Sequence, residues 1–182
     1  MILLAVVIRQ ALRKDAPRLA QINHAAWAAA YPRILSAALL ARQLEADAMT
    51  RTAAMWMRRL SHPSADQGMT SLVAEDQGLV IGWIRVGPAE APEHSMGEVH
   101  GIYVDPEWWG EGVGRSLMEA GHEVLRSSGF SKAILWVLEG NDRAKRFYEH
   151  LGWSWDGTLR MTKFDGELAK EVKYARQLPS SN

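Results

Sequence analysis

Residues 103–117 read YVDPEWWGEGVGRSL. The pattern predicts that a strand ending at Val104 runs into a loop with glycine at positions 110, 112 and 114, and that this loop opens a helix. Backbone N–H groups at a helix N-terminus bind anions, and glycines allow a phosphate to approach the main chain. The stretch therefore predicts a phosphate-binding loop, and a glycine-rich turn without a ligand is the alternative interpretation.

Two other phosphate-binding motifs do not fit this loop. The dinucleotide motif G-x-G-x-x-G needs a glycine at position 115, where the chain has Arg115. The P-loop ends in Gly-Lys-Ser or Gly-Lys-Thr, and this ending is absent. The loop therefore predicts neither an NAD site nor an ATP site.

The rest of the chain alternates between helical and strand-like patterns. Only residues 98–138 have the pattern of a strand–helix–strand crossover, and the other strands pair as hairpins. We expect a mixed α/β fold: a mostly antiparallel sheet of about seven strands with helices on both faces, in a single domain over residues 1–182. The expected strands are 1–8, 70–75, 79–87, 98–104, 133–138, 158–164 and 170–177, and the expected helices are 16–31 with Asp15 as N-cap and Pro17 in the first turn, 36–44, 47–60, 112–128, and 142–151 with Asn141 as N-cap.

Composition excludes several classes of protein. The 182 residues contain no cysteine, which excludes a disulfide scaffold, a cysteine zinc site and a cysteine nucleophile. The 21 Lys and Arg are balanced by 21 Asp and Glu, so no net field favours nucleic acid or an anionic membrane as partner. The apolar segment 1–8 lacks the features of a signal peptide and is too short to span a membrane. We expect a cytoplasmic protein.

A second motif follows the predicted crossover. Residues 135–153 read LWVLEGNDRAKRFYEHLGW, a short apolar strand followed by a helix that Asn141 caps. Together with residues 105–117, this segment resembles the GCN5-related N-acetyltransferase (GNAT) family. The loop is similar to the family's pyrophosphate motif, Gln/Arg-x-x-Gly-x-Gly/Ala, with Gly112 and Gly114 at the small positions and Trp109 in place of Gln or Arg. The resemblance covers residues 97–155, and the remainder matches in element order.

The resemblance implies a GNAT fold and an acetyl-CoA-dependent N-acetyltransferase. The acetyl group would move to a primary amine of a small molecule or peptide by direct attack in a ternary complex. A non-catalytic acyl-CoA-binding or sensing module of the same fold is the alternative. By resemblance, acetyl-CoA is the co-substrate, its pantetheine bonds to strand residues Ile102, Tyr103 and Val104, and one backbone N–H of this strand polarises the thioester. The other implied binding residues are Trp109, Gly110, Gly112, Val113, Gly114, Arg115 and Ser116 in the loop and Asn141, Arg143 and Ala144 after the fifth strand.

Acyl transfer needs a base for the amine and a proton donor for the departing thiolate. The resemblance implies Tyr148 as general acid, and a buried packing tyrosine is the alternative role. It implies Glu98 as the base, either directly or through a water. His100 has the same strand parity as Glu98, so the two side chains should share a face. We favour Glu98 over His100 as the base.

The acceptor is the least defined part of the predicted site. The N-terminal helices offer Trp27, Tyr31 and Trp56 as lining for its pocket. Residues 93–123 hold seven acidic side chains and one Arg, which would suit a cationic amine if they line the cleft. No metal-ligand spacing occurs, so we expect no metal. Edge strands and a Trp-rich C-terminal hairpin make a homodimer an open expectation.

Overall fold

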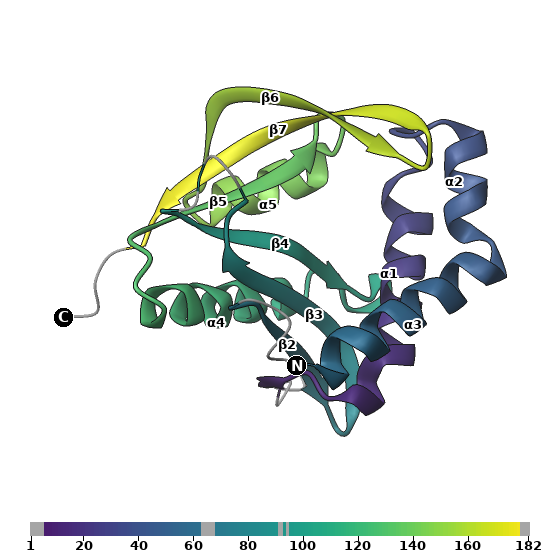
Figure 1. Cartoon of the computed structure of the whole chain (residues 1–182), viewed down its shortest axis with the longest axis horizontal. Coiled ribbons are helices and arrows are strands. Elements are labelled where there is room, and N and C mark those ends of the chain that lie inside the picture. Colours follow the sequence, from purple (N-terminus) through teal and green to yellow (C-terminus); the bar gives the residue numbers. More distant parts are fainter. Residues whose placement is uncertain (1–5, 63–67, 91–92, 94, 179–182) are drawn as a thin grey trace.

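The computed structural model describes residues 6–62, 68–90, 93 and 95–178, and a seven-stranded sheet of order β1-β2-β3-β4-β5-β7-β6 organises them (Figure 1). The pairing of β4 with β5 is parallel, and the other pairings are antiparallel. The predicted mixed α/β fold is therefore confirmed. The strands are β1 (Val7–Gln10), β2 (Thr70–Asp76), β3 (Leu79–Pro88), β4 (Gly97–Val104), β5 (Lys132–Leu138), β6 (Ser154–Phe164) and β7 (Glu167–Gln177), and the helices are α1 (Ala16–Ala30), α2 (Ala37–Leu44), α3 (Ala46–Ser61), α4 (Val113–Ser127) and α5 (Asp142–His150), with short 3-10 turns η1 (Arg13–Asp15) and η3 (Pro106–Trp108).

Each face of the sheet is covered by helices. On one face α1 and α3 bury Leu19, Ile22 and Trp56 against β3, and on the other face α4 and α5 bury a larger cluster that includes Leu117 and Tyr148. Trp56 is only 1% exposed, and its ring packs edge-on against Trp83 with centroids 4.8 Å apart. The expectation that Trp56 lines the acceptor pocket is wrong, because helix α3 turns this side chain into the core.

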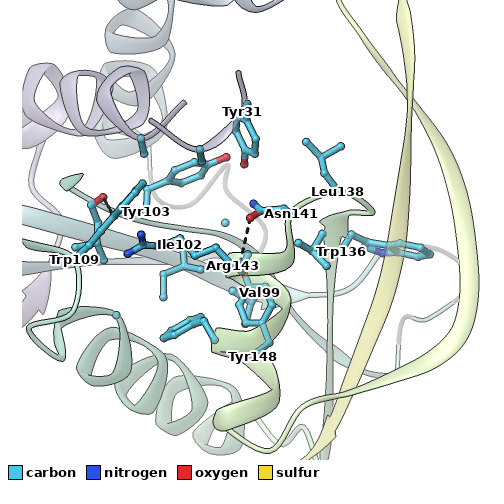
Figure 2. A pocket seen from close by; sticks show the side chains of 18 of the residues that line it. Tyr31, Val99, Ile102, Tyr103, Trp109, Trp136, Leu138, Asn141, Arg143 and Tyr148 are labelled. Atoms are coloured by element: carbon cyan, nitrogen blue, oxygen red, sulfur yellow. Dashed lines mark hydrogen bonds between the residues drawn. The ribbon is translucent and has the colours of Figure 1, made fainter. Parts of the chain in front are cut away.

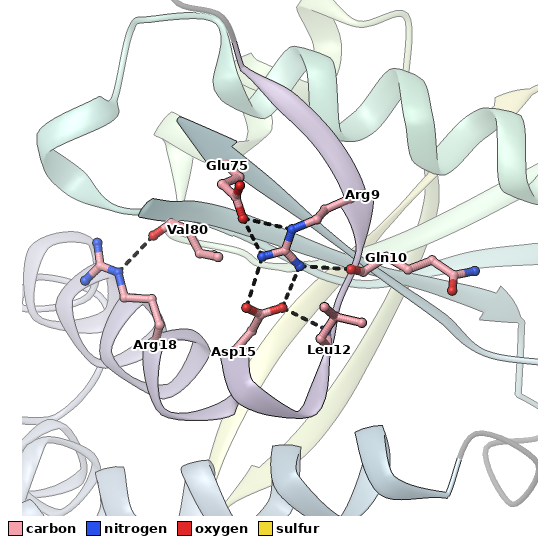
Figure 3. Close-up of polar contacts among 7 residues, drawn as sticks. All are labelled: Arg9, Gln10, Leu12, Asp15, Arg18, Glu75 and Val80. Atoms are coloured by element: carbon pink, nitrogen blue, oxygen red, sulfur yellow. Dashed lines mark hydrogen bonds and ion pairs between the residues drawn. The ribbon is translucent and has the colours of Figure 1, made fainter. Parts of the chain in front are cut away.

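The start of helix α1 is fixed differently from the prediction (Figure 3). Asp15 occupies the N-cap position and Pro17 lies in the first turn, as predicted. The Asp15 carboxylate, however, makes no capping hydrogen bond to the helix. It accepts instead from the guanidinium of Arg9 at 2.7 Å and from the Leu12 N–H at 2.7 Å. Burial alone would raise the pKa of Asp15, but these hydrogen bonds outweigh it and hold the pKa below its usual value. Arg9 also binds Glu75 on β2, so one cluster joins β1, β2 and α1.

Three strands differ from their predicted bounds by more than one residue. β7 begins at Glu167 rather than at 170, because it pairs with β6 directly from the turn of the hairpin. β1 runs from Val7 to Gln10, past the predicted end at residue 8, because Arg9 and Gln10 pair with β2. The other part of the predicted first strand, residues 1–5, lies outside the described residues. β6 begins at Ser154 rather than at 158, with an irregular pairing between Trp155 and Leu159 where Gly157 has a φ of +90°. Glycine accommodates this backbone without strain, and the strand continues through it.

The parallel pair β4–β5 separates part-way along its length. The two strands pair only over Gly97–Val99 and Ala133–Leu135. On its other side β4 pairs with β3 through an irregularity at which His100 has no directly opposed residue. Beyond this bulge β4 stays with β3 while β5 follows β7, and the two strands diverge (Figure 1). The backbone of β4 beyond Val99 is thus left without a strand on its β5 side.

The β6–β7 hairpin extends across the molecule to the N-terminal helices (Figure 1). At its tip Arg42 of α2 contacts Asp165 at 3.0 Å and Glu167 at 2.7 Å. The Ser36 hydroxyl donates to Glu167 at 2.6 Å. These contacts hold the hairpin over the opening between β4 and β5.

Candidate active site

A cleft of about 680 Å³ occupies the opening between β4 and β5. Its walls come from α1, β4, the glycine loop, β5, α5 and the β6–β7 hairpin. Most of the residues predicted as binding residues line it, and Tyr148 does too. The predicted residues in its wall are Ile102, Tyr103, Val104, Trp109, Gly110, Gly112, Gly114, Arg115, Asn141, Arg143, Ala144 and Tyr148.

The glycine loop forms one end of the cleft and leads into α4. Gly112 is the N-cap of α4 and has a φ of +83°, a backbone conformation that residues other than glycine rarely adopt. Gly114 lies inside the first turn, where an added Cβ would stand 3.2 Å from the ring of Phe147. The side chain of Val113 is buried in the core, and the hydroxyl of Ser116 faces back to the Gly112 carbonyl at 3.4 Å. Val113 can therefore offer a ligand only its backbone N–H, whereas the N–H of Ser116 already donates to the Gly112 carbonyl at 3.1 Å.

Trp109 has a defined structural position in this loop. Its indole Nε1 donates to the Val104 carbonyl at 2.8 Å, which ties the loop to the end of β4. The guanidinium carbon of Arg143, from α5, lies 3.8 Å from the centre of the indole ring (Figure 2). A hydrogen bond and a cation–π contact thus fix this side chain. Because the Val104 carbonyl already has this donor, a ligand along β4 must rely mainly on other backbone groups.

Helix α5 forms the wall of the cleft opposite β4 and contributes Tyr148, and its N-cap residue Asn141 also lines this wall. The Asn141 side-chain oxygen accepts from the Ala144 N–H at 3.1 Å, which confirms the predicted cap (Figure 2). Tyr148 is 8% exposed, and no described residue hydrogen-bonds to its hydroxyl. Burial raises the pKa of Tyr148 well above its usual value, so the phenol stays protonated at neutral pH and can act as a donor.

Glu98 and His100 lie side by side on β4, as the strand parity predicted. Glu98 Oε1 is 3.6 Å from His100 Nδ1, and the other ring nitrogen of His100 is 3.1 Å from the Pro88 carbonyl. Burial raises the pKa of Glu98 despite the opposing effect of His100 and Arg160. His100 lines the cleft, whereas Glu98 is 8% exposed and lies behind it. Glu98 does not line the cleft itself, and the neighbouring His100 lies between them.

The end of the cleft away from the glycine loop is aromatic and polar; we call it the acceptor end. Trp27 and Tyr31 line it as predicted, and the Tyr31 hydroxyl points toward that of Tyr103 (Figure 2). No acidic residue of segment 93–123 lines the cleft: Asp105 is paired with Arg18 at 2.6 Å, and Glu107, Glu111, Glu119 and Glu123 are exposed. Five further residues that line this end were not predicted from the sequence: Trp136, Arg160, Thr162, Phe164 and Glu171. The alternation of side chains along β6 would have placed its three members, Arg160, Thr162 and Phe164, on one face.

Among the described residues, no three His, Asp or Glu side chains gather in an arrangement that could hold a metal ion. None of the helices in this part of the chain is long and apolar enough to cross a membrane.

A seven-stranded mixed sheet with helices on both faces is the fold of solved N-acetyltransferases. The sequence profile of the Acetyltransferase (GNAT) family matches residues 36–153, so the chain belongs to this family. The expected assignment is confirmed.

Similar proteins carry acetyltransferase names. The mycothiol acetyltransferase of Thermobispora bispora is 42% identical over 85 residues, which cover 45% of this chain and 29% of that protein. The chain thus matches less than a third of the length of this relative. PaiA N-acetyltransferase from Thermoplasma acidophilum, solved with coenzyme A, superposes with a TM-score of 0.76 at 16% identity and covers 95% of this chain and 99% of that one. An acetyltransferase from Salmonella typhimurium, solved with acetyl-CoA, gives 0.69 at 20% identity over 97% and 96% of the two chains.

Proposed function

We propose that this protein transfers the acetyl group of acetyl-CoA to a primary amine of a small molecule or peptide. The observation that carries the proposal is the cleft between β4 and β5, which joins the glycine loop, the unpaired edge of β4 and the Tyr148 hydroxyl. The relative named mycothiol acetyltransferase supports an acceptor that is a small molecule.

The residues present suit acetyl-CoA. The N–H groups of the glycine loop and the first turn of α4, with Arg115 and Arg143 beside them, would hold the pyrophosphate. The backbone of Ile102 faces the open edge of β4 and would bond the pantetheine arm, whereas that of Tyr103 faces β3. A backbone N–H of β4 would polarise the thioester carbonyl. Asn141 and Ala144 would contact the arm from the opposite wall.

The transfer requires two proton movements. The amine nitrogen attacks the thioester carbon, a C–N bond forms and the C–S bond breaks. Glu98 takes the proton of the amine through a water beside His100, and Tyr148 gives its proton to the departing sulfur. The raised pKa of Glu98 supports its role because it makes this carboxylate a stronger base. Tyr148 is a neutral phenol, so it carries the proton that the departing thiolate takes.

Two finer proposals concern the protein as a whole. We place the reaction in the cytoplasm because the chain contains no cysteine. We also propose a homodimer through the C-terminal hairpin, because β6 is an edge strand with Trp155 and Met161 56% and 58% exposed. Sedimentation of the purified protein tests the dimer, and a monomer mass at every concentration would contradict it.

The experiment that tests the function is an acceptor screen. Protein, acetyl-CoA and a panel of amines are mixed, and free thiol is followed over the rate of hydrolysis without amine. We expect Tyr148→Phe to lower kcat about 100-fold with little change in CoA affinity, because the substitution removes only the proton donor. Stabilisation by CoA without consumption of any acceptor would instead indicate the non-catalytic acyl-CoA-binding module.

A further inference from the structure

Glu171 is a buried carboxylate in the wall of the acceptor end. It lies on β7 between Arg160 of β6 and Leu138 of β5, and it is 7% exposed. The Arg160 Nε donates to it at 2.7 Å and the Thr162 hydroxyl at 2.6 Å. Burying a charged group costs free energy unless partners satisfy it, so a carboxylate in this position calls for an explanation.

Both donors to Glu171 reach the same oxygen. Arg160 and Thr162 bond to Oε2, and no described residue donates to Oε1. A carboxylate has about four acceptor positions, so half of this group is available to a ligand in the cleft. The bonds to Oε2 also fix the orientation of the side chain, and they leave Oε1 as a prepared acceptor.

The charged side chains around this end form ion pairs. Two cations, Arg160 and Lys173, lie over the ring of Trp136, at 4.1 and 5.7 Å from its centre. Lys173 is paired with Glu93 at 3.0 Å and Asp156 at 3.2 Å, and Arg160 is paired with Glu171. Glu98 adds a fourth carboxylate that interacts with Arg160. Glu171 is the one carboxylate among the described residues that line the cleft, so its Oε1 is the group there that can pair with a cationic ligand.

The opposite wall is aromatic. The rings of Trp27 and Tyr31 meet edge-on with centroids 4.8 Å apart, and Phe164 of the hairpin meets Trp27 at 6.3 Å. Aromatic faces attract both hydrocarbon and ammonium groups. A carboxylate facing such a wall can hold the charged end of a molecule whose carbon skeleton lies along the rings.

We propose that Glu171 binds a second cationic group of the acceptor, so that the substrate is a diamine or a larger molecule with a second ammonium or guanidinium. This inference rests on the proposed function. The group at Glu171 differs from the amine that is acetylated, because a carboxylate stabilises the protonated form and an attacking amine must be neutral. Glu171 is thus a specificity-determining residue, and the proton transfers belong to Glu98 and Tyr148.

The test compares amines that differ in a single charge. One probe is 1,4-bis(aminomethyl)benzene, and its partner is 4-ethylbenzylamine, which has the same heavy-atom skeleton and one ammonium fewer. Linear alkane diamines with the corresponding alkylamines extend the comparison to other lengths. Binding to the CoA complex is measured by isothermal titration, and acetylation is read separately from thiol release.

We expect a diamine to bind about 10- to 100-fold more tightly than its matched monoamine, the range of one charged hydrogen bond. Glu171→Gln keeps the shape and removes the charge, so this preference should disappear while CoA binding and the melting temperature change little. Glu123→Gln is the control, because that carboxylate is exposed on α4 across the sheet.

The outcomes separate the inference from the function. Equal binding of every matched pair, or a preference that persists in Glu171→Gln, would overturn the role of Glu171 even if acetylation proceeds. A charge preference that depends on Glu171 supports that role even if no acceptor is acetylated. In that case the absence of thiol release would count against the proposed transferase.

Discussion

Trp109 replaces the Gln or Arg that the GNAT motif usually carries, and its contacts show how the loop accommodates the change. The indole N–H bonds to the Val104 carbonyl, and the ring supports Arg143 from the other wall. One side chain therefore links the glycine loop, β4 and α5. These contacts fix the loop in place, and they hold Arg143 beside it.

Substitutions at Trp109 separate its two contacts. Trp109→Phe keeps a ring under Arg143 and loses the hydrogen bond, so we expect the Kd for CoA to rise about 2- to 10-fold. Trp109→Ala loses both contacts and should raise it further, by more than tenfold. Isothermal titration with CoA measures both changes. Trp155→Phe on the exposed face of β6 is the control, and similar effects there would contradict the role assigned to Trp109.

The identity of the base can be decided from the pH dependence of kcat/KM. A base must be deprotonated, and the pKa of Glu98 is raised, so we expect activity to fall on acidification at a pH above the ordinary 4.5 of a glutamate. Glu98→Gln should lower kcat/KM about 100-fold and remove this acidic limb. His100→Asn should move the limb to higher pH, because the charge of His100 lowers the pKa of Glu98. If His100 were the base, the limb would vanish in His100→Asn.

The site residues that sequence predicted and those that it missed differ in the range of their interactions. Asn141 and Gly112 act within one turn of chain, so their type and spacing suffice to predict them. Glu171 enters the cleft only because β7 lies between β5 and β6, a register that no local pattern indicates. Trp56 was wrongly predicted to line the pocket. An aromatic residue on an amphipathic helix can face either a pocket or the core, and only the packing of α3 shows that Trp56 faces the core.

At the level of elements, the cleft depends on the way β4 ends and α4 begins. The bulge at His100 turns β4 away from β5, and the positive φ of Gly112 turns the chain into α4. These two local features leave both the unpaired strand edge and the free helix N-terminus facing the same space. The crossover predicted over residues 98–138 gave the order of β4, α4 and β5 correctly. The sequence pattern did not predict that β4 and β5 separate.

Glycine substitutions test whether this backbone conformation serves binding. Gly112 and Gly129 have φ values of +83° and +91°, and an added Cβ would meet nothing within 4 Å at either position. Gly112→Ala and Gly129→Ala should therefore each cost about 1 kcal/mol of stability, from backbone strain alone. Only Gly112→Ala should also weaken CoA binding, by about tenfold or more. Urea unfolding and titration with CoA measure the two effects, and equal CoA affinity in both variants would argue against the loop as the pyrophosphate site.

Across the whole molecule, the two ends of the cleft come from different parts of the chain. The glycine loop, α4 and α5 lie in the middle of the sequence, where the GNAT motifs are found. The acceptor end joins α1 and α2 to the β6–β7 hairpin, segments more than a hundred residues apart. The motifs in the middle of the sequence therefore predicted the glycine-loop end, whereas no local motif indicated the residues that meet at the acceptor end.

The contact between α2 and the hairpin tip should control how often the acceptor end opens. Arg42, Asp165 and Glu167 are 37% to 49% exposed, so solvent screens each ion pair and its contribution to the stability of the fold is small. Arg42→Gln should leave the melting temperature nearly unchanged but speed amide hydrogen exchange in residues 160–168 about two- to tenfold, because local opening no longer breaks these pairs. Exchange in β2 and β3 should not change. Arg51→Gln, at an exposed arginine of α3, is the control. Unchanged exchange at the hairpin would mean that the sheet alone holds it over the cleft.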